Sequence, residues 1–243
     1  MEKFLFLGAS SEVCIEFIKN HSWHNDDEIF AQYYKNNSAL SELQNKIPAK
    51  MKLFQADFKS EVDTKNFADL IGAENFVPTH ILHASAVPVE NRRFNELEWQ
   101  DFQSQLNVQC RALFMLLKNL IKPMAKAKSG NIVLILSSCT LNVPPKFLAD
   151  YVTAKYALMG LGKALAAEYA AKNIKVNMIS PSMMETKFLS NIHGLISEQN
   201  AANNPLKRNA APSDIIKLLE FLFSAENTFV TGANIPVTGG ENF

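Results

Sequence analysis

Short runs of apolar residues alternate along this chain with longer amphipathic stretches, and this alternation constrains the fold more than any other feature. The apolar runs are continuous, which predicts strands buried on both faces of a parallel sheet. We predict strands over residues 4–7, 29–33, 52–55, 81–83, 131–136, 175–179 and 233–237. We predict helices over residues 12–20, 98–124, 150–172 and 215–223. Helices between successive parallel strands place the chain in the α/β class.

Length, charge and cysteine content exclude several classes of protein. A chain of 243 residues fits one α/β domain. The 24 basic and 24 acidic residues cancel, so no net charge favours nucleic acid or anionic lipid. Cys14, Cys110 and Cys139 show no zinc-binding spacing. Every apolar run is far shorter than the ~20 residues that span a bilayer. We expect a soluble cytoplasmic protein with no metal, membrane or nucleic-acid partner.

Residues 181–205 form the longest stretch without a clear pattern. Such a segment in a compact domain is often a lid over a binding site. A pair of surface helices is an equally good interpretation of the same residues, and the sequence leaves both open.

A turn that suits a phosphate follows the first predicted strand. Gly8 comes directly after that strand, and the next helix opens within a few residues. Glycine allows close backbone approach, and the amides of a helix N-terminus face anions. An ordinary strand-to-helix turn explains these residues equally well. The position of the turn, directly after the first strand, is therefore stronger evidence for a phosphate site than the residues themselves.

Four polar residues form a pattern that points to proton transfer. Tyr151 and Lys155 are four residues apart and share one face of a predicted helix. An ammonium group beside a phenol stabilises the phenolate and lowers its pKa. Ser138 lies thirteen residues before Tyr151, at the end of the strongest predicted strand. Asn107 lies in the preceding long helix, where an Asn is mildly unfavourable.

Asn107, Ser138, Tyr151 and Lys155, in this order and spacing, resemble the catalytic tetrad of the short-chain dehydrogenase/reductase family. The likeness extends from Phe4 to Gly240, and the subgroup it resembles most is the beta-ketoacyl-acyl-carrier-protein reductases. The resemblance implies a Rossmann-like, doubly wound, mostly parallel seven-stranded sheet with helices on both faces, in a single domain. Residues 1–130 would then be the dinucleotide-binding half and residues 131–243 the catalytic and substrate-lid half.

The resemblance also implies which residues bind a nicotinamide dinucleotide. Asp57 matches the family residue that meets the adenine, and Thr186 the one that meets the nicotinamide carboxamide. Lys35 follows the second strand where no acid is present, which favours NADP(H) over NAD(H). The expected cofactor-binding residues are Gly8, Ser10, Ser11, Glu12, Val13, Lys35, Asp57, Phe58, Ala84, Ser85, Ala86, Tyr151, Lys155, Pro181, Ser182, Met184 and Thr186.

The chain departs from the family pattern in three places. Glu12 and Cys14 stand where two glycines are usual, so either Glu12 turns away from the phosphates or cofactor binding is weakened. His83 begins the segment that is usually Asn-Asn-Ala-Gly, and we expect it to be structural. Ser182 replaces a glycine after Pro181.

Together these features predict an NAD(P)(H)-dependent oxidoreductase that interconverts a carbonyl and a secondary alcohol. Tyr151 would be the general acid, Ser138 would polarise the carbonyl, Lys155 would lower the pKa of Tyr151 and bind ribose, and Asn107 would hold a relay water. The expected substrate is a 3-oxoacyl-type or similar small carbonyl. Two alternatives stay open: a sugar or polyol oxidoreductase of surface-polysaccharide biosynthesis, and a weakly active dinucleotide-binding scaffold or sensor.

The two longest predicted helices carry apolar residues on more than one face. A helix that is apolar all round is buried. The resemblance implies that Glu98–Met124 and Asp150–Lys172 pack against a second subunit. We expect a homodimer or homotetramer.

Overall fold

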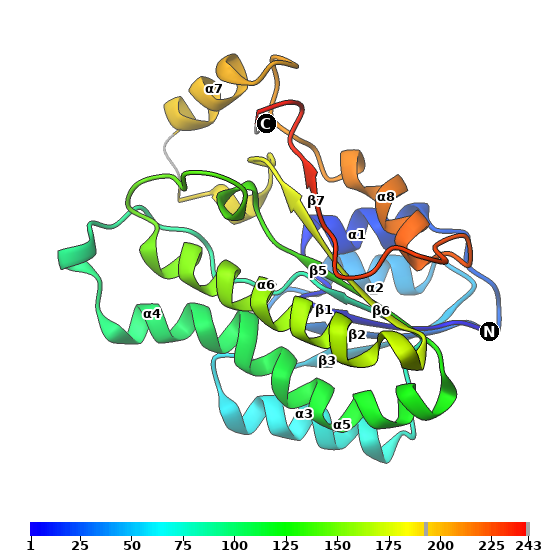
Figure 1. The fold of residues 1–243 in the computed structure, drawn as a ribbon. Coiled ribbons are helices and arrows are strands. Elements are labelled where there is room, and N and C mark those ends of the chain that lie inside the picture. Colours follow the sequence, from blue (N-terminus) through cyan, green and yellow to red (C-terminus); the bar gives the residue numbers. More distant parts are fainter. Residues whose placement is uncertain (192–193, 242–243) are drawn as a thin grey trace.

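A parallel β-sheet forms the centre of the molecule, with helices on both faces (Figure 1). The computed structural model describes residues 1–191 and 194–241. Within them, seven strands pair in the order β3-β2-β1-β4-β5-β6-β7, and every pairing is parallel. The strands are β1 (Lys3–Leu7), β2 (Glu28–Tyr33), β3 (Lys50–Gln55), β4 (His80–His83), β5 (Gly130–Ile135), β6 (Ile174–Pro181) and β7 (Asn234–Val237). The predicted fold class and the seven predicted strands are confirmed.

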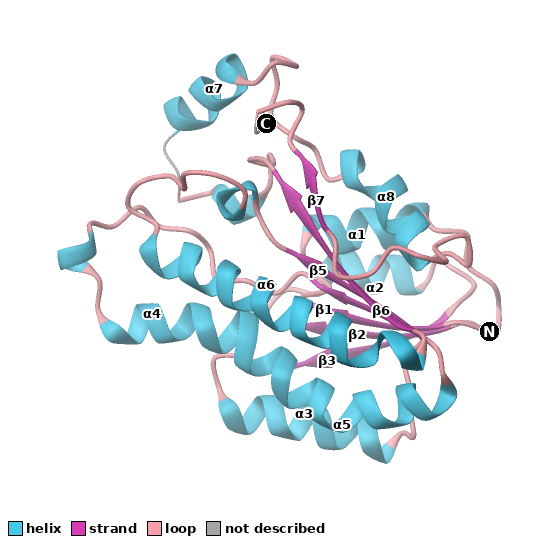
Figure 2. Ribbon diagram, viewed as in Figure 1, coloured by secondary structure: helices cyan, strands magenta, loops and turns pink. Residues whose placement is uncertain are grey.

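Two separate apolar layers bury the two faces of the sheet. Figure 2 shows the helices on either side of the strands. One layer is supplied by α3 (Glu61–Ala73), α5 (Ala112–Ala127) and α6 (Ala149–Tyr169). The opposite layer is supplied by α1 (Glu12–Asn20), α2 (Ser38–Gln44) and α8 (Ser213–Phe223). Because the strands are covered on both sides, their sequences are continuously apolar.

The long helix predicted over residues 98–124 is three elements. α4 (Trp99–Leu106) leads into the π-helical turn η2 (Asn107–Arg111), and α5 then runs past Pro123 to Ala127. The predicted end near Pro123 is therefore wrong. Proline removes one backbone hydrogen bond, but the apolar face of this last turn is buried, Met124 completely.

Two further helices, α2 and α3, were absent from the prediction. α2 buries a single residue, α3 buries four, and α7 (Gly194–Asn203) has no buried residue. α7 and the short turn η5 (Lys187–Leu189) occupy the segment interpreted as a lid or a helix pair. Residues 192 and 193 of that segment lie outside the described residues.

The strand order creates a switch point between β1 and β4. The chain adds β2 and β3 on one side of β1, then returns to place β4 on the other side. Leu7 is paired with both Gln32 and His83, so β1, β2 and β4 end side by side. Ligands of open parallel sheets bind outside the carboxyl ends of the strands at such a point.

Two glycines of α6 give a matched test of how tightly this helix packs on the sheet. A methyl group on Gly162 would lie 2.9 Å from Leu134 Cδ1 and from Met178 Sδ, whereas one on Gly160 meets nothing within 4 Å. We expect Gly160→Ala to raise the free energy of unfolding by ~0.5–1 kcal/mol through helix propensity. Gly162→Ala should lower it by ~1 kcal/mol because the core is overfilled. Urea unfolding of both variants measures this, and equal effects would contradict the packing.

Candidate active site

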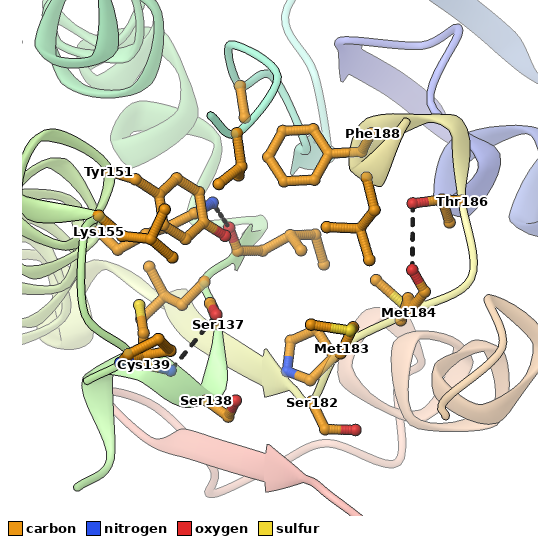
Figure 3. A pocket seen from close by; sticks show the side chains of 18 of the residues that line it. Ser137, Ser138, Cys139, Tyr151, Lys155, Ser182, Met183, Met184, Thr186 and Phe188 are labelled. Carbon is orange, nitrogen blue, oxygen red and sulfur yellow. Dashed lines mark hydrogen bonds between the residues drawn. The ribbon is translucent and has the colours of Figure 1, made fainter. Parts of the chain in front are cut away.

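A cavity of about 360 Å³ opens at the carboxyl edge of the sheet (Figure 3). Its walls come from the segments after β1, β4, β5 and β6, from α6, and from residues 145–148. The residues from the predicted set that line it are Ser11, Glu12, Val13, Ala84, Ala86, Ser138, Tyr151, Lys155, Pro181, Ser182, Met184 and Thr186. Segments from distant parts of the chain thus meet at one place, because parallel strands end at a common edge.

The turn after β1 is held in close backbone contact with the end of β4. Gly8 has φ of +77°, and a Cβ there would lie 2.7 Å from the backbone N of Ser85. The backbone N–H of Gly8 donates to Gln32 Oε1 at 2.8 Å, and Gln32 Nε2 donates to the carbonyl of Ala56 at 2.7 Å. A side chain at Gly8 is therefore excluded both by conformation and by space.

Tyr151 and Lys155 lie together in the wall formed by α6. Both side chains are buried, and Lys155 Nζ lies 5.5 Å from the centroid of the Tyr151 ring. Lys155 Nζ also donates to the carbonyl of Ile135, at the end of β5, at 2.7 Å. This bond ties α6 to the strand that carries the serines.

Ser137, rather than Ser138, is the serine that meets Tyr151. Burial raises the pKa of the Tyr151 phenol, and the neighbouring Ser137 hydroxyl acts in the opposite direction. Ser137 Oγ also accepts from the backbone N of Cys139 at 3.3 Å. Ser138 lines the cavity farther from Tyr151, beside Ser182 (Figure 3). The spacing from Tyr151 predicts Ser138. The end of β5 points instead to Ser137, because Ser137 is the first serine after the strand.

Asn107 is not among the residues that line the cavity. It is the first residue of the π-helical turn, and its carbonyl accepts from the backbone N of Ala112. Gln109, two residues further, is the fully buried polar side chain of this turn, and its Oε1 has no partner within the described chain. Its backbone carbonyl accepts from His83 Nε2 at 2.8 Å. The extra residue of the π-turn changes which side chains face inward, so the expectation for Asn107 receives no support from this geometry.

His83 braces the site. It is buried at the end of β4, and its Nε2 carries the proton because a carbonyl can only accept. Burial lowers the pKa of His83 to about 4, with the charge of Lys155 acting in the same direction. A neutral imidazole therefore joins β4 to η2.

Burial changes the acid–base properties of the Tyr151–Lys155 pair in opposite directions. It raises the pKa of Tyr151 well above its ordinary value, and the lowering expected from Lys155 stays a prediction. It lowers the pKa of Lys155 to about 8. At neutral pH the phenol thus holds its proton and most Lys155 side chains are charged. A protonated donor beside a cation suits delivery of a proton.

Glu12 reaches from the first turn of α1 to a distant segment. Its Oε1 accepts from the backbone N of Lys187 at 2.9 Å, across 175 residues of chain. The residue also lines the cavity together with Ser11 and Val13, so its effect on cofactor binding stays a prediction.

The remaining predicted cofactor residues lie outside the cavity lining. Lys35 is exposed after β2, with Nζ 4.9 Å from the centroid of the Tyr34 ring. Asp57 accepts from the backbone N of Lys59, and Phe58 is packed in the core. Ser85 is buried beside the Gly8 turn, and its hydroxyl has no partner within the described chain. Ser10 is exposed in the same turn.

The residues present fit a nicotinamide dinucleotide. The Gly8 turn provides a close backbone approach at the start of α1, where helix amides favour phosphate. Lys155, Pro181 and Thr186 line the deeper part of the same cavity. Among the described residues no group of three or more His, Cys, Asp or Glu side chains is placed to hold a metal ion.

Known proteins share both the sequence and this architecture. The family model described as enoyl-(acyl carrier protein) reductase matches residues 25–242. The chain belongs to the short-chain dehydrogenase/reductase family. Its relatives include reductases of carbonyl groups, and the chain is an NAD(P)-dependent carbonyl reductase of this family.

Two curated relatives and one solved structure describe the similarity. 3-Oxoacyl-(acyl-carrier-protein) reductase FabG of Buchnera aphidicola subsp. Baizongia pistaciae is 32% identical over 167 residues, which are 69% of this chain and 68% of that protein. Acetoacetyl-CoA reductase of Allochromatium vinosum is 30% identical over 188 residues, 77% of this chain and 76% of that protein. 4-Hydroxyisoleucine dehydrogenase complexed with NADH is 28% identical, with a TM-score of 0.87 and coverage of 99% and 98%.

None of the helices in the described residues combines the length and the apolar character that are needed to cross a membrane.

Lys155 gives a test of the site's electrostatics through stability. Its pKa is lower in the folded protein than its ordinary value of 10.5, so the cost of burying the charge is fully present below pH 8. Between pH 8 and 10.5 the folded state loses the proton first and the cost disappears. We expect Lys155→Met to raise the free energy of unfolding by ~2 kcal/mol at pH 7. This gain should shrink between pH 8 and 10.5 in urea titrations. A variant less stable than the wild type at pH 7 would contradict the assignment.

Proposed function

We propose that this enzyme is an NADPH-dependent reductase of a 3-oxoacyl thioester or a similar small carbonyl compound. The observation that carries the proposal is the meeting of Tyr151, Ser137 and Lys155 at the base of one cavity. The walls above them are largely apolar, with Val89, Phe188 and Ile196 among the lining residues. An apolar cavity with a few convergent polar groups suits a small acyl chain that ends in a reactive carbonyl. The printed names of the two curated relatives support this substrate class.

The chain's own residues supply the proton and the orientation. When bound, the dinucleotide supplies the hydride. Tyr151 donates its proton to the carbonyl oxygen, and the phenolate that remains is stabilised by the Lys155 ammonium. Ser137 donates a hydrogen bond to the same oxygen and polarises the carbonyl. The bond from Lys155 to the Ile135 carbonyl keeps the ammonium in place.

Binding of the dinucleotide is assigned to the two sides of the switch point. The Gly8 turn and the amides at the start of α1 would hold the pyrophosphate, and residues 181–186 would hold the nicotinamide end. Lys35, with no carboxylate in residues 34–37, would pair with a 2′-phosphate and so favour NADP(H) over NAD(H).

A homodimer or homotetramer is part of the proposal. Exposed aromatic side chains on three helices support it, namely Trp99 of α4, Phe114 of α5 and Tyr156 of α6. Sedimentation velocity measures the assembly directly, and a monomer would overturn this part. The cytoplasmic location stays a prediction from the sequence.

The function is tested by binding and turnover together. We expect NADPH to bind more tightly than NADH in a fluorescence titration, and acetoacetyl-CoA to be reduced with consumption of NADPH. Tyr151→Phe should lower turnover at least ~100-fold, because it removes the donated proton. Tyr169→Phe, at the opposite end of the same helix and outside the cavity lining, is the control. Binding of neither dinucleotide would favour the scaffold or sensor alternative, and reduction of ketosugars alone would favour the sugar or polyol alternative.

Substitution of each neighbouring serine tests which of the two polarises the carbonyl: Ser137, which lies nearer to Tyr151 in the structure, or Ser138, which the sequence spacing predicts. We expect Ser137→Ala to lower kcat/KM by ~100-fold, since the donor that polarises the carbonyl is lost. Ser138→Ala should change it less than ~10-fold. Both substitutions remove one hydroxyl, so each is the other's control, and melting temperatures report any loss of the Cys139 contact. The reverse ranking would return the catalytic role to Ser138.

A further inference from the structure

A single carboxylate joins the start of α1, next to the Gly8 turn, to the turn η5 in the cavity wall. Glu12 lies in the first turn of α1, and its Oε1 accepts a hydrogen bond from the backbone N of Lys187 at 2.9 Å. Lys187 is the first residue of η5, which lines the cavity on the side opposite to Ser137 (Figure 3). The contact joins two segments that are 175 residues apart in the chain.

This carboxylate performs a task that a local side chain usually performs. The residue before a helical turn commonly caps it with its own side chain. Thr186 holds that position in η5 but makes no such bond, and its hydroxyl donates to the carbonyl of Met184 instead. Glu12 therefore caps η5 from another element.

The inner side of η5 faces the reacting groups. The ring of Phe188 lies 5.9 Å from that of Tyr151, and Phe188 and Leu189 both line the cavity. The segment just before η5 is anchored separately, because the backbone N of Glu185 donates to Ala210 and that of Ala210 donates to Met183. From Lys187 onward, the Glu12 bond is the hydrogen bond that joins this turn to another element of the described chain, and the others run within the turn.

We propose that Glu12 is a positioning residue that fastens η5 over the cavity and so sets the place of Phe188 above Tyr151. The effect that we expect on KM rests on the proposed function, whereas the fastening of η5 does not. The bond is exposed at the surface, but it joins a carboxylate to a backbone N–H, and a charge-assisted bond of this kind is stronger than one between neutral groups. Position 12, where the family usually has glycine, thus carries a side chain in this protein that holds η5.

The first test uses the protein without cofactor or substrate. Hydrogen–deuterium exchange is measured on peptides that cover residues 185–191. We expect Glu12→Ala to speed exchange there about tenfold, because a charge-assisted bond is lost. Glu12→Gln, which keeps an oxygen acceptor, should stay within about threefold of the wild type. Glu16→Ala is the matched control, since Glu16 lies one turn further along α1 and bonds to Asn20 instead.

Unchanged exchange in Glu12→Ala would overturn the proposal, whatever the enzyme's activity. Faster exchange across the whole chain would do so as well, because it would show a general loss of stability rather than a released turn.

The second test measures what the fastening does for turnover. With acetoacetyl-CoA and NADPH, we expect Glu12→Ala to raise the KM for the thioester about tenfold while kcat changes less than threefold. Glu12→Gln should restore the KM to within about threefold of the wild-type value. A wild-type enzyme inactive on this substrate would count against the proposed function alone, because the exchange result stands independently. A KM that is equal in the alanine variant and the wild type would overturn the kinetic part of the inference.

Discussion

The close approach of the Gly8 turn to the end of β4 is the constraint on which the rest of the site depends. Gly8 fits against the Ser85 backbone because it lacks a side chain, and the buried Gln32 amide links the turn to the end of β3. These contacts align the ends of β1, β2, β3 and β4 at one edge. The parallel register then brings the end of β5 beside them, and Ser137 with it. The cavity is the space that this shared edge leaves between the sheet and α6.

Burial both creates and limits the chemistry of this site. The same removal from water that keeps the Tyr151 phenol protonated makes the Lys155 charge costly to hold. The protein keeps that charge by giving its ammonium group a carbonyl partner on β5. The buried Lys155 charge therefore lowers the stability of the folded protein at the place where the charge is needed for function, as is common for buried ionisable groups.

Features that depend on local sequence could be predicted, and features that depend on distant contacts could not. The strands were predicted because burial on both faces leaves a continuous apolar run. α2 was missed because it buries a single residue, Leu40, and so carries almost no pattern. Tyr151 and Lys155 were found because four residues make one helical turn. The prediction of Ser138 counts across an irregular loop whose length no propensity fixes, whereas in the structure Ser137 lies nearer to Tyr151. The expectation for Asn107 could not foresee a π-turn, and no pattern within one segment reveals that Glu12 reaches Lys187.

Ser137 and Tyr151 belong to different elements, and the exposed segment 141–148 connects them. The strand β5 sets the serine and the helix α6 sets the tyrosine, so the segment between them has no part in aligning the two hydroxyl groups. Four of its residues, Pro145, Lys146, Phe147 and Leu148, nevertheless line the cavity. Part of the cavity wall is thus built by a stretch of chain that is separate from the proposed reacting groups. An engineer could graft segments of other lengths and compositions here to retarget the enzyme without rebuilding its proton donor.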